Sequence, residues 1–175
     1  QKTIDENGLA EIIREYRDGL IFYLSGFVNN FHTAEELAEE TFVFLGTKKP
    51  RDKGKGSFKT WLYTIARNRA INYLRKNSRV VEISVYECAE LKSDQENLEE
   101  NYIREEKKIL LHRAISKLKP EYRQVLWLTY FEKLSNKQTA SIMKKTVHNI
   151  ETLVYRARKA LKTQLEMEGF EYEEL

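Results

Sequence analysis

Apolar residues recur every three or four positions along the first part of the chain. Residues at this spacing lie on one face of an α-helix, and such a face is usually buried against other elements. The pattern therefore predicts amphipathic helices whose apolar sides build a core. Two stripes show it, the first formed by Leu9, Ile12, Ile13, Tyr16 and Leu20 and the second by Tyr23, Leu24, Phe27 and Val28.

A further helix is predicted over residues 33–46. Thr33 and Glu36 have the spacing of a capping box, in which each side chain bonds the other residue's backbone N–H at a helix start. Gly46 suits the end of this helix, because glycine readily takes the left-handed conformation that is common there. The apolar face of the helix consists of Ala34, Leu37, Ala38, Thr41 and Leu45.

The next stretch joins a basic loop to a helix of mixed character. Residues 48–57, KKPRDKGKGS, contain two glycines among cationic side chains. Residues 58–76, FKTWLYTIARNRAINYLRK, follow as a helix that begins apolar and aromatic and ends amide-rich and basic. The first half of this helix can pack on the preceding helices, while the second half continues beyond the core. Asparagine and arginine there can pair with bases or phosphates, or the asparagines can simply satisfy backbone groups.

A second helical unit is predicted from residue 106, and Pro120 suits the first turn of one of its helices. A helix-turn-helix follows over residues 134–161, LSNKQTASIMKKTVHNIETLVYRARKAL. Ser135 and Gln138 form a capping box at its start, and residues 144–146 break it. The inner face of its second helix carries Ile150, Leu153, Val154, Ala157 and Leu161, and its outer side carries His148, Glu151, Thr152, Tyr155, Arg156, Arg158, Lys159 and Lys162.

This outer side has the layout of a DNA-reading helix. The N-terminal residues of such a helix can reach base edges in the major groove, and later basic residues can hold phosphates. An ordinary amphipathic helix would show the same inner stripe, so that alternative stays open.

Composition favours helices throughout, because seven Gly and two Pro in 175 residues leave little turn chemistry. The single β-rich stretch, VVEISVY at 80–86, has no partner strand nearby. The sequence therefore predicts an all-α protein with two small helical domains, residues 1–79 and 106–168. An acidic linker at 80–105 joins them, and an acidic tail follows at 169–175.

Charge is distributed in blocks. Residues 1–79 carry a net charge of +4, residues 80–106 carry −7, residues 107–168 carry +9 and the tail carries −3. Two basic blocks around an acidic segment indicate a polyanion such as nucleic acid as partner, although charge can also merely solvate helices. Glutamates 35, 36, 39 and 40 share one flank of their helix. That flank is either a solvated face or a docking surface for a basic protein, since DNA would be repelled.

Several functions are excluded or disfavoured. Cys88 is the only cysteine, so one chain cannot form a disulfide or a four-cysteine metal site. The three histidines lie in different predicted elements, and no HExxH, P-loop or GxSxG motif occurs, so we predict no enzyme activity, metal or cofactor. No apolar run approaches the roughly 20 residues of a membrane span. The start, QKTIDENGLAEI, shows no signal-peptide segment, which predicts a cytoplasmic protein.

Three stretches together resemble one family. AEELAEETFVFL (34–45), FKTWLYTIARNRAINYLRK (58–76) and LKPEYRQVLWLTYFEKLS (118–135) with the following YRARKAL are similar to bacterial sigma factors of the extracytoplasmic-function group. The resemblance covers about four-fifths of the chain, and the motifs are specific. It implies an all-helical RNA polymerase sigma factor that directs core polymerase to promoters. A helix-turn-helix regulator that is not a polymerase subunit is the alternative.

The resemblance also implies roles for individual residues. The first domain would bind the clamp helices of core RNA polymerase through Glu36, Leu37, Glu40 and Phe42. It would also bind the −10 element and a flipped base of the melted non-template strand through Lys53, Lys55, Ser57, Lys59, Trp61, Arg67, Asn68, Arg69 and Asn72. The second domain would read the −35 element of double-stranded promoter DNA through the outer side of its helix-turn-helix.

The family resemblance has further implications and some departures. In this family the acidic linker runs through the RNA channel of polymerase. The negative charge of the linker alone would equally suit a disordered tether between the two domains. An anti-sigma protein is a common partner in the family. Glu39 stands where the family usually has glutamine. Lys144 replaces a turn glycine, and Glu151 and Leu153 replace basic contact residues, which bears on the −35 preference.

Overall fold

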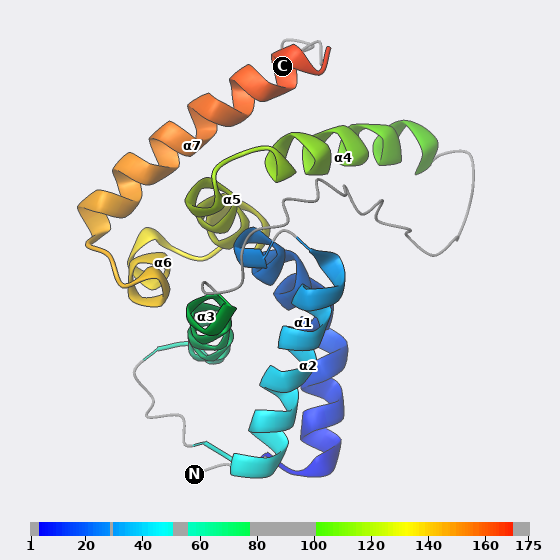
Figure 1. Ribbon diagram of the computed structural model, residues 1–175, viewed down its shortest axis with the longest axis vertical. Helices are drawn as coiled ribbons and strands as arrows, with labels where there is room; N and C mark the ends of the chain where they lie inside the picture. Colours follow the sequence, from blue (N-terminus) through cyan, green and yellow to red (C-terminus); the bar gives the residue numbers. More distant parts are fainter. Residues whose placement is uncertain (1–3, 29, 51–55, 78–100, 170–175) are drawn as a thin grey trace.

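The computed structural model describes residues 4–28, 30–50, 56–77 and 101–169, with side chains described from residue 107 onward in the last range. Every regular element in these ranges is helical, as the hydrophobic pattern predicts (Figure 1). The described helices include none with the combined length and hydrophobicity of a membrane span. Lys53, Lys55, Cys88 and nearly all of the predicted linker and tail lie outside the described residues.

The first unit consists of α1 (Glu6–Val28), α2 (Phe31–Lys48) and α3 (Phe58–Asn77). The two apolar stripes predicted near the N-terminus belong to the one continuous helix α1. Helices α1 and α2 lie side by side, and α3 packs on both (Figure 1). Their shared core is formed by fully buried side chains, among them Leu20, Tyr23, Leu24, Leu45, Leu62 and Tyr63.

The predicted ends of α2 are wrong at both termini. Asn30, not Thr33, caps the start, because the Asn30 side chain accepts a hydrogen bond from the Thr33 backbone N–H at 3.2 Å. The helix also runs past Gly46 and ends at Lys49, which takes the left-handed conformation at φ 42°. Gly46 has a packing reason instead: a Cβ there would lie 2.9 Å from a methyl carbon of Leu9 on α1.

The second unit consists of α4 (Asn101–Ser116), α5 (Pro120–Leu126), a π-helical turn (Trp127–Phe131), α6 (Asn136–Met143) and α7 (Val147–Met167). Helix α4 begins inside the segment that the charge pattern assigns to the linker. Pro120 occupies the first turn of α5, as predicted. The missing N–H of proline costs nothing at this position, because the first N–H groups of a helix have no partner within the helix.

Helices α6 and α7 form the predicted helix-turn-helix. Ser135 and Gln138 make both hydrogen bonds of a capping box, at 3.1 and 2.9 Å. Lys144 then ends α6 in the left-handed conformation, with φ 54°. Thr146 begins α7 by accepting a hydrogen bond from the Asn149 backbone N–H at 3.1 Å. The break predicted at residues 144–146 is therefore confirmed.

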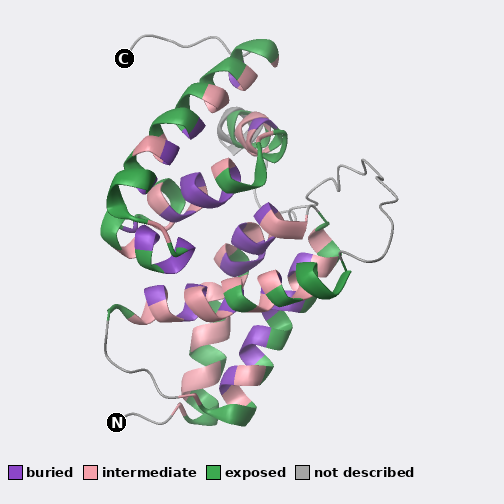
Figure 2. Ribbon diagram, turned by 60° about the vertical axis from the view of Figure 1, so that its left-hand side comes forward, coloured by how far each residue is buried: buried purple, intermediate pink, exposed green. Residues whose placement is uncertain are grey.

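The two units pack directly on each other. Helix α5 lies against α1, and α6 lies against α3. Buried residues of both units form one continuous apolar cluster that extends from Leu20 to Ala157. Figure 2 shows buried residues where the helices face one another and exposed residues along the outer side of α7. This packing brings part of the predicted −10 surface into contact with the second unit.

Candidate polymerase and nucleic-acid interfaces

An acidic face lies on α2, where Glu36, Glu39 and Glu40 are exposed. These three glutamates border an open groove of about 600 Å³. The other residues that line the groove are Val43, Phe44, Thr47, Lys48 and Arg69. Val43 is 61% exposed, so the groove offers an apolar contact beside carboxylates. A basic protein surface with apolar side chains would fit this combination, whereas a nucleic acid would be repelled by the carboxylates.

The other two predicted polymerase-binding residues lie in the core. Leu37 is 3% exposed and Phe42 is 4% exposed. In this arrangement they hold α2 in place and offer no surface to a partner. Glu35 is also occupied, because its carboxylate lies 3.3 Å from the guanidinium of Arg17 on α1. The cation that offsets this glutamate comes from a neighbouring helix, which inspection of α2 alone cannot reveal.

The start of α3 carries the predicted −10 residues Ser57, Lys59 and Trp61. The Ser57 hydroxyl accepts a hydrogen bond from the Thr60 backbone N–H at 3.2 Å and therefore caps the helix. Trp61 is half-buried, and its ring centroid lies 5.5 Å from that of Phe58. Both side chains therefore have structural contacts within the first unit, which hold the N-terminal end of α3 in position.

Farther along α3, the amides and the arginines differ in accessibility. Asn68 and Asn72 are exposed on one side of the helix. Arg67 and Arg69 are half-buried. The Arg69 guanidinium lies 4.5 Å from the ring centroid of Phe44, in a cation–π contact beside the acidic face. Within this helix the asparagines are therefore the more available groups for base edges.

The outer side of α7 is largely exposed. All of its predicted −35 residues are exposed except Thr152, which is half-buried and donates a hydrogen bond to the His148 carbonyl at 3.2 Å. Lys159 lies 5.5 Å from the ring of Tyr155, and Arg158 lies 5.8 Å from the ring of Tyr130. The inner residue Ile150 is fully buried. Helix α7 therefore presents a continuous polar and cationic surface, supported from behind by the core.

The departures from the family pattern fall in different surroundings. Leu153 is only 9% exposed and belongs to the apolar core, so it is not part of the outer surface. Glu151 is exposed and forms no salt bridge with the side chains that the structure describes. Lys144 preserves the left-handed turn in spite of its Cβ. Of these changes, only Glu151 alters the chemistry of the outer face of α7.

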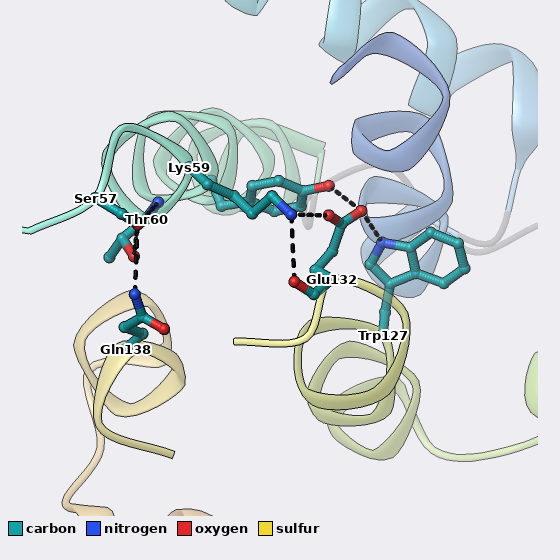
Figure 3. Close-up of polar contacts among 7 residues, drawn as sticks. Ser57, Lys59, Thr60, Trp127, Glu132 and Gln138 are labelled. Atoms are coloured by element: carbon teal, nitrogen blue, oxygen red, sulfur yellow. Dashed lines mark hydrogen bonds and ion pairs between the residues drawn. The ribbon is translucent and has the colours of Figure 1, made fainter. Parts of the chain in front are cut away.

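One contact between the units was not predicted from the sequence. The Glu132 carboxylate, from the end of the π-helical turn, accepts a 2.6 Å hydrogen bond from the Tyr63 hydroxyl and pairs with Lys59 at 3.0 Å (Figure 3). The Trp127 indole N–H donates to the same carboxylate at 3.2 Å. Burial, followed by the charge of Glu132, raises the pKa of Tyr63 far above its usual range. Tyr63 therefore remains a donor. We call these four residues the Glu132 cluster.

A second polar contact lies beside this cluster. The Gln138 side-chain amide on α6 donates to the Ser57 hydroxyl at 3.4 Å (Figure 3). Two predicted −10 residues, Ser57 and Lys59, thus contact the unit that carries the helix-turn-helix. Their partners, Glu132 and Gln138, are distant in the chain, and the motifs that contain these two residues do not indicate a contact with α3, so the sequence contained no signal for this arrangement.

Comparison with known proteins matches both units to sigma factor families. The family model of sigma-70 region 2 matches residues 12–80, and that of sigma-70 region 4 matches residues 108–161. The sigma factor SigM of Bacillus subtilis is 30% identical over 154 residues, covering 88% of this chain and 93% of SigM. The sigma factor YlaC of the same organism is 29% identical over 160 residues, covering 91% and 92%.

A solved structure shares the arrangement of the helices. The sigma factor RpoE from Bartonella quintana, in complex with the anti-sigma factor NepR, has a TM-score of 0.71 and 21% sequence identity. The similarity covers 90% of this chain and 96% of RpoE. The comparison supports the all-helical fold, with its two units, over nearly the whole chain.

Proposed function

The chain belongs to the extracytoplasmic-function group of sigma-70 factors, and we propose how its surfaces divide the work of promoter recognition. As a sigma factor it directs core RNA polymerase to specific promoters and initiates transcription there. Sigma factors are regulators of transcription initiation rather than enzymes. We propose that this chain likewise has no catalytic activity of its own and acts in the cytoplasm, where core polymerase is found.

We assign polymerase binding to the acidic face of α2. Glu36, Glu39 and Glu40 are exposed there beside Val43. This face supports the proposal because exposed carboxylates repel the phosphate backbone and attract a basic protein surface. The buried residues Leu37 and Phe42 contribute by fixing the position of the helix.

We assign the two promoter elements to α3 and α7. In the first domain, residues 1–79, Asn68 and Asn72 supply groups for bases of the −10 element, and Lys59 supplies a cation for the melted strand. In the second domain, residues 106–168, the outer side of α7 reads the −35 element. The observation that carries this assignment is the exposure of His148, Glu151 and Tyr155 ahead of the cations Arg156, Arg158, Lys159 and Lys162. Bases are read near the start of such a helix, and phosphates hold it in register.

The alternative of a DNA-binding regulator outside polymerase is not favoured. Such a regulator needs the helix-turn-helix alone, whereas this chain also matches sigma-70 region 2 over residues 12–80. We further propose an anti-sigma protein as a regulatory partner. The support is that RpoE, which shares this fold, was solved in complex with the anti-sigma factor NepR.

Charge reversal on α2 tests the polymerase assignment. The double variant Glu36→Lys with Glu40→Lys should lose co-elution with core RNA polymerase, because it turns attraction to a basic surface into repulsion. Glu11→Lys with Glu15→Lys is the matched control, since it makes the same charge change at the same spacing on the exposed side of α1. Both proteins should keep their helical circular dichroism. Co-elution of the α2 variant at the level of the control would refute the assignment.

A further inference from the structure

The Glu132 cluster joins the two units through one carboxylate. Lys59 and Tyr63 come from α3, whereas Trp127 and Glu132 come from the second unit (Figure 3). Lys59 is held twice, because its ammonium also donates to the Glu132 backbone carbonyl at 3.2 Å. The Glu132 side chain is only 12% exposed. Hydrogen bonds that involve a charged group and are shielded from water are stronger than those at the surface.

The surface of α1 is shaped to receive the second unit. Gly26 is buried, and its carbonyl accepts hydrogen bonds from Arg123 at 3.1 Å and Gln124 at 3.4 Å. The last carbonyls of a helix lack partners within the helix and carry partial negative charge, so a guanidinium is a favourable cap. Gly19 lies one heptad earlier. A Cβ on Gly19 would overlap a Glu132 carboxylate oxygen and lie 2.8 Å from the Tyr63 hydroxyl.

Aromatic side chains extend this interface. The ring of Phe22 on α1 stacks on Trp127 at 5.0 Å and on His112 of α4 at 5.2 Å. The closed arrangement therefore combines apolar stacking, a helix cap and a buried ion pair. Such a combination holds the two units together without any other protein.

The closed arrangement conflicts with simultaneous promoter binding. The −10 and −35 elements are about 25 base pairs apart, which is roughly 85 Å of duplex at 3.4 Å per base pair. In the closed chain α6 packs directly on α3, and α7, with 21 residues, is only about 30 Å long at 1.5 Å per residue. The units must therefore separate before both elements can be occupied.

We propose that Glu132 is an internal latch that keeps the free chain closed by occupying Lys59. The carboxylate takes the place of a phosphate of the melted strand, so that Glu132 and the strand compete for the same cation. This inference rests on the proposed role of Lys59 at the −10 element. It goes beyond that role, because it makes strand binding by the free chain depend on separation of the two units.

Two variants open the latch by different means. Glu132→Ala removes the acceptor shared by Lys59, Tyr63 and Trp127. Gly19→Ala leaves every charge in place but puts a methyl group where the Glu132 carboxylate lies, and it favours the α1 helix, since alanine is a better helix former than glycine. The matched controls are Glu121→Ala, which removes the exposed 3.2 Å pair with Lys145 within the second unit, and Gly8→Ala, which lies at the far end of α1.

The separation of the units can be measured directly in the full-length chain. Fluorescent dyes on cysteines at Glu11 and Met167, both exposed, report the distance between α1 and α7 in a Cys88→Ser background. We expect energy transfer to fall in Glu132→Ala and Gly19→Ala and to stay unchanged in both controls. Unchanged energy transfer in both opening variants would overturn the latch, whatever the chain does with polymerase or promoter DNA.

Competition for Lys59 is tested with a labelled single-stranded DNA of mixed sequence. Loss of a hydrogen-bonded charged partner is worth roughly a tenfold change in an equilibrium, so the two opening variants should bind the strand about tenfold more tightly than the controls. The double variant Lys59→Ala with Glu132→Ala should also open, with low energy transfer, but should gain no strand affinity, because the cation that the strand would bind is gone. If the units separate but the affinity for the single strand does not change, then Glu132 and the strand do not compete for Lys59. Loss of co-elution with core polymerase is a separate readout that tests the α2 assignment alone.

Discussion

Helices α3 and α7, the two proposed DNA readers, differ in how free their cations are. On α7 two of the proposed phosphate-contacting cations lie over aromatic rings, with Lys159 beside Tyr155 and Arg158 beside Tyr130. A cation–π contact leaves the positive charge in place for a phosphate. On α3 the charge of Lys59 is neutralised by Glu132. The difference indicates that the proposed −35 surface is accessible in the closed chain, while Lys59 of the proposed −10 surface becomes a free cation only when the units separate.

The same difference explains why the two surfaces should respond differently to core polymerase. Any partner that binds only the separated units shifts the equilibrium toward the open state by its differential affinity. Helix α3 gains a free cation in that shift, whereas α7 gains none. If core polymerase binds only the separated units, it should therefore affect the proposed −10 binding through α3 more than the proposed −35 binding through α7.

Removal of the α7 cations should have the largest effect on DNA binding. In the triple variant Arg156→Ala, Arg158→Ala and Lys159→Ala, the affinity for duplex DNA should fall for all sequences, and the salt slope should fall by about three, since each phosphate contact contributes about one. The measurement is duplex affinity against salt concentration for the free chain. Lys59→Ala should leave that slope unchanged, because its charge is already paired with Glu132.

A matched triple variant on α4 controls for net charge. Lys107→Ala, Lys108→Ala and Arg113→Ala remove the same charge from exposed positions away from the outer side of α7. An equal loss of slope in this control would contradict the assignment, because binding would then follow total charge rather than the α7 surface.

Local sequence signals predicted a large part of the fold. The Ser135–Gln138 capping box, the Pro120 helix start and the inner stripe of α7 are all determined by residues within a few positions of one another, and all are confirmed. The end caps of α2 were misplaced because several neighbouring residues can serve as caps. Asparagine is at least as good an N-cap as threonine, and Asn30 lies three residues before Thr33, so the local sequence offers both as the start of α2.

Long-range contacts escaped prediction for a different reason. Glu132 lies 73 residues from Lys59 and 69 from Tyr63 in the chain. Nothing in the sequence around Glu132 indicates an acidic residue that is buried against another unit. The hydrophobic pattern placed Leu37 on the apolar face of its helix, whereas the family resemblance assigned Leu37 and Phe42 to polymerase contact; the structure buries both side chains. Residue type and spacing thus identified the candidate surfaces, while the tertiary packing decided which side chains are available on them.

Base-directed changes on α7 should have an intermediate effect. Glu151→Ala or Thr152→Ala should alter which −35 sequences are preferred, because a base contact contributes about 1–3 kcal/mol of discrimination. Lys159→Ala should weaken binding evenly, because phosphate contacts carry no sequence information. If Glu151 accepts a hydrogen bond from a cytosine amino group, Glu151→Ala should change the preferred −35 sequence. If Glu151 only orients neighbouring cations, Glu151→Ala should leave that sequence preference unchanged. Selection from randomised upstream elements with each holoenzyme distinguishes them. If every variant selects the wild-type element equally, the outer side of α7 is not the reader.

We expect the smallest effect from a substitution in the turn of the helix-turn-helix, which should change the stability of the protein but not its −35 sequence preference. Lys144 takes the left-handed conformation at φ 54°, which costs a residue with a Cβ about 1–2 kcal/mol. Glycine relieves that cost, but it gives the unfolded chain more conformational entropy, which destabilises the folded state by about 0.5–1 kcal/mol. Lys144→Gly should therefore raise the free energy of unfolding by about 0.5–1 kcal/mol, measured by urea denaturation. Lys144→Ala, which keeps the Cβ, should gain nothing. Lys162→Gly, in the middle of the exposed side of α7, should instead lose about 0.5–1 kcal/mol of stability.

Because Lys144 lies outside the outer side of α7, its glycine variant should select the same −35 sequence as the wild type. Destabilisation by Lys144→Gly would mean that the lysine side chain, rather than the backbone, holds the turn.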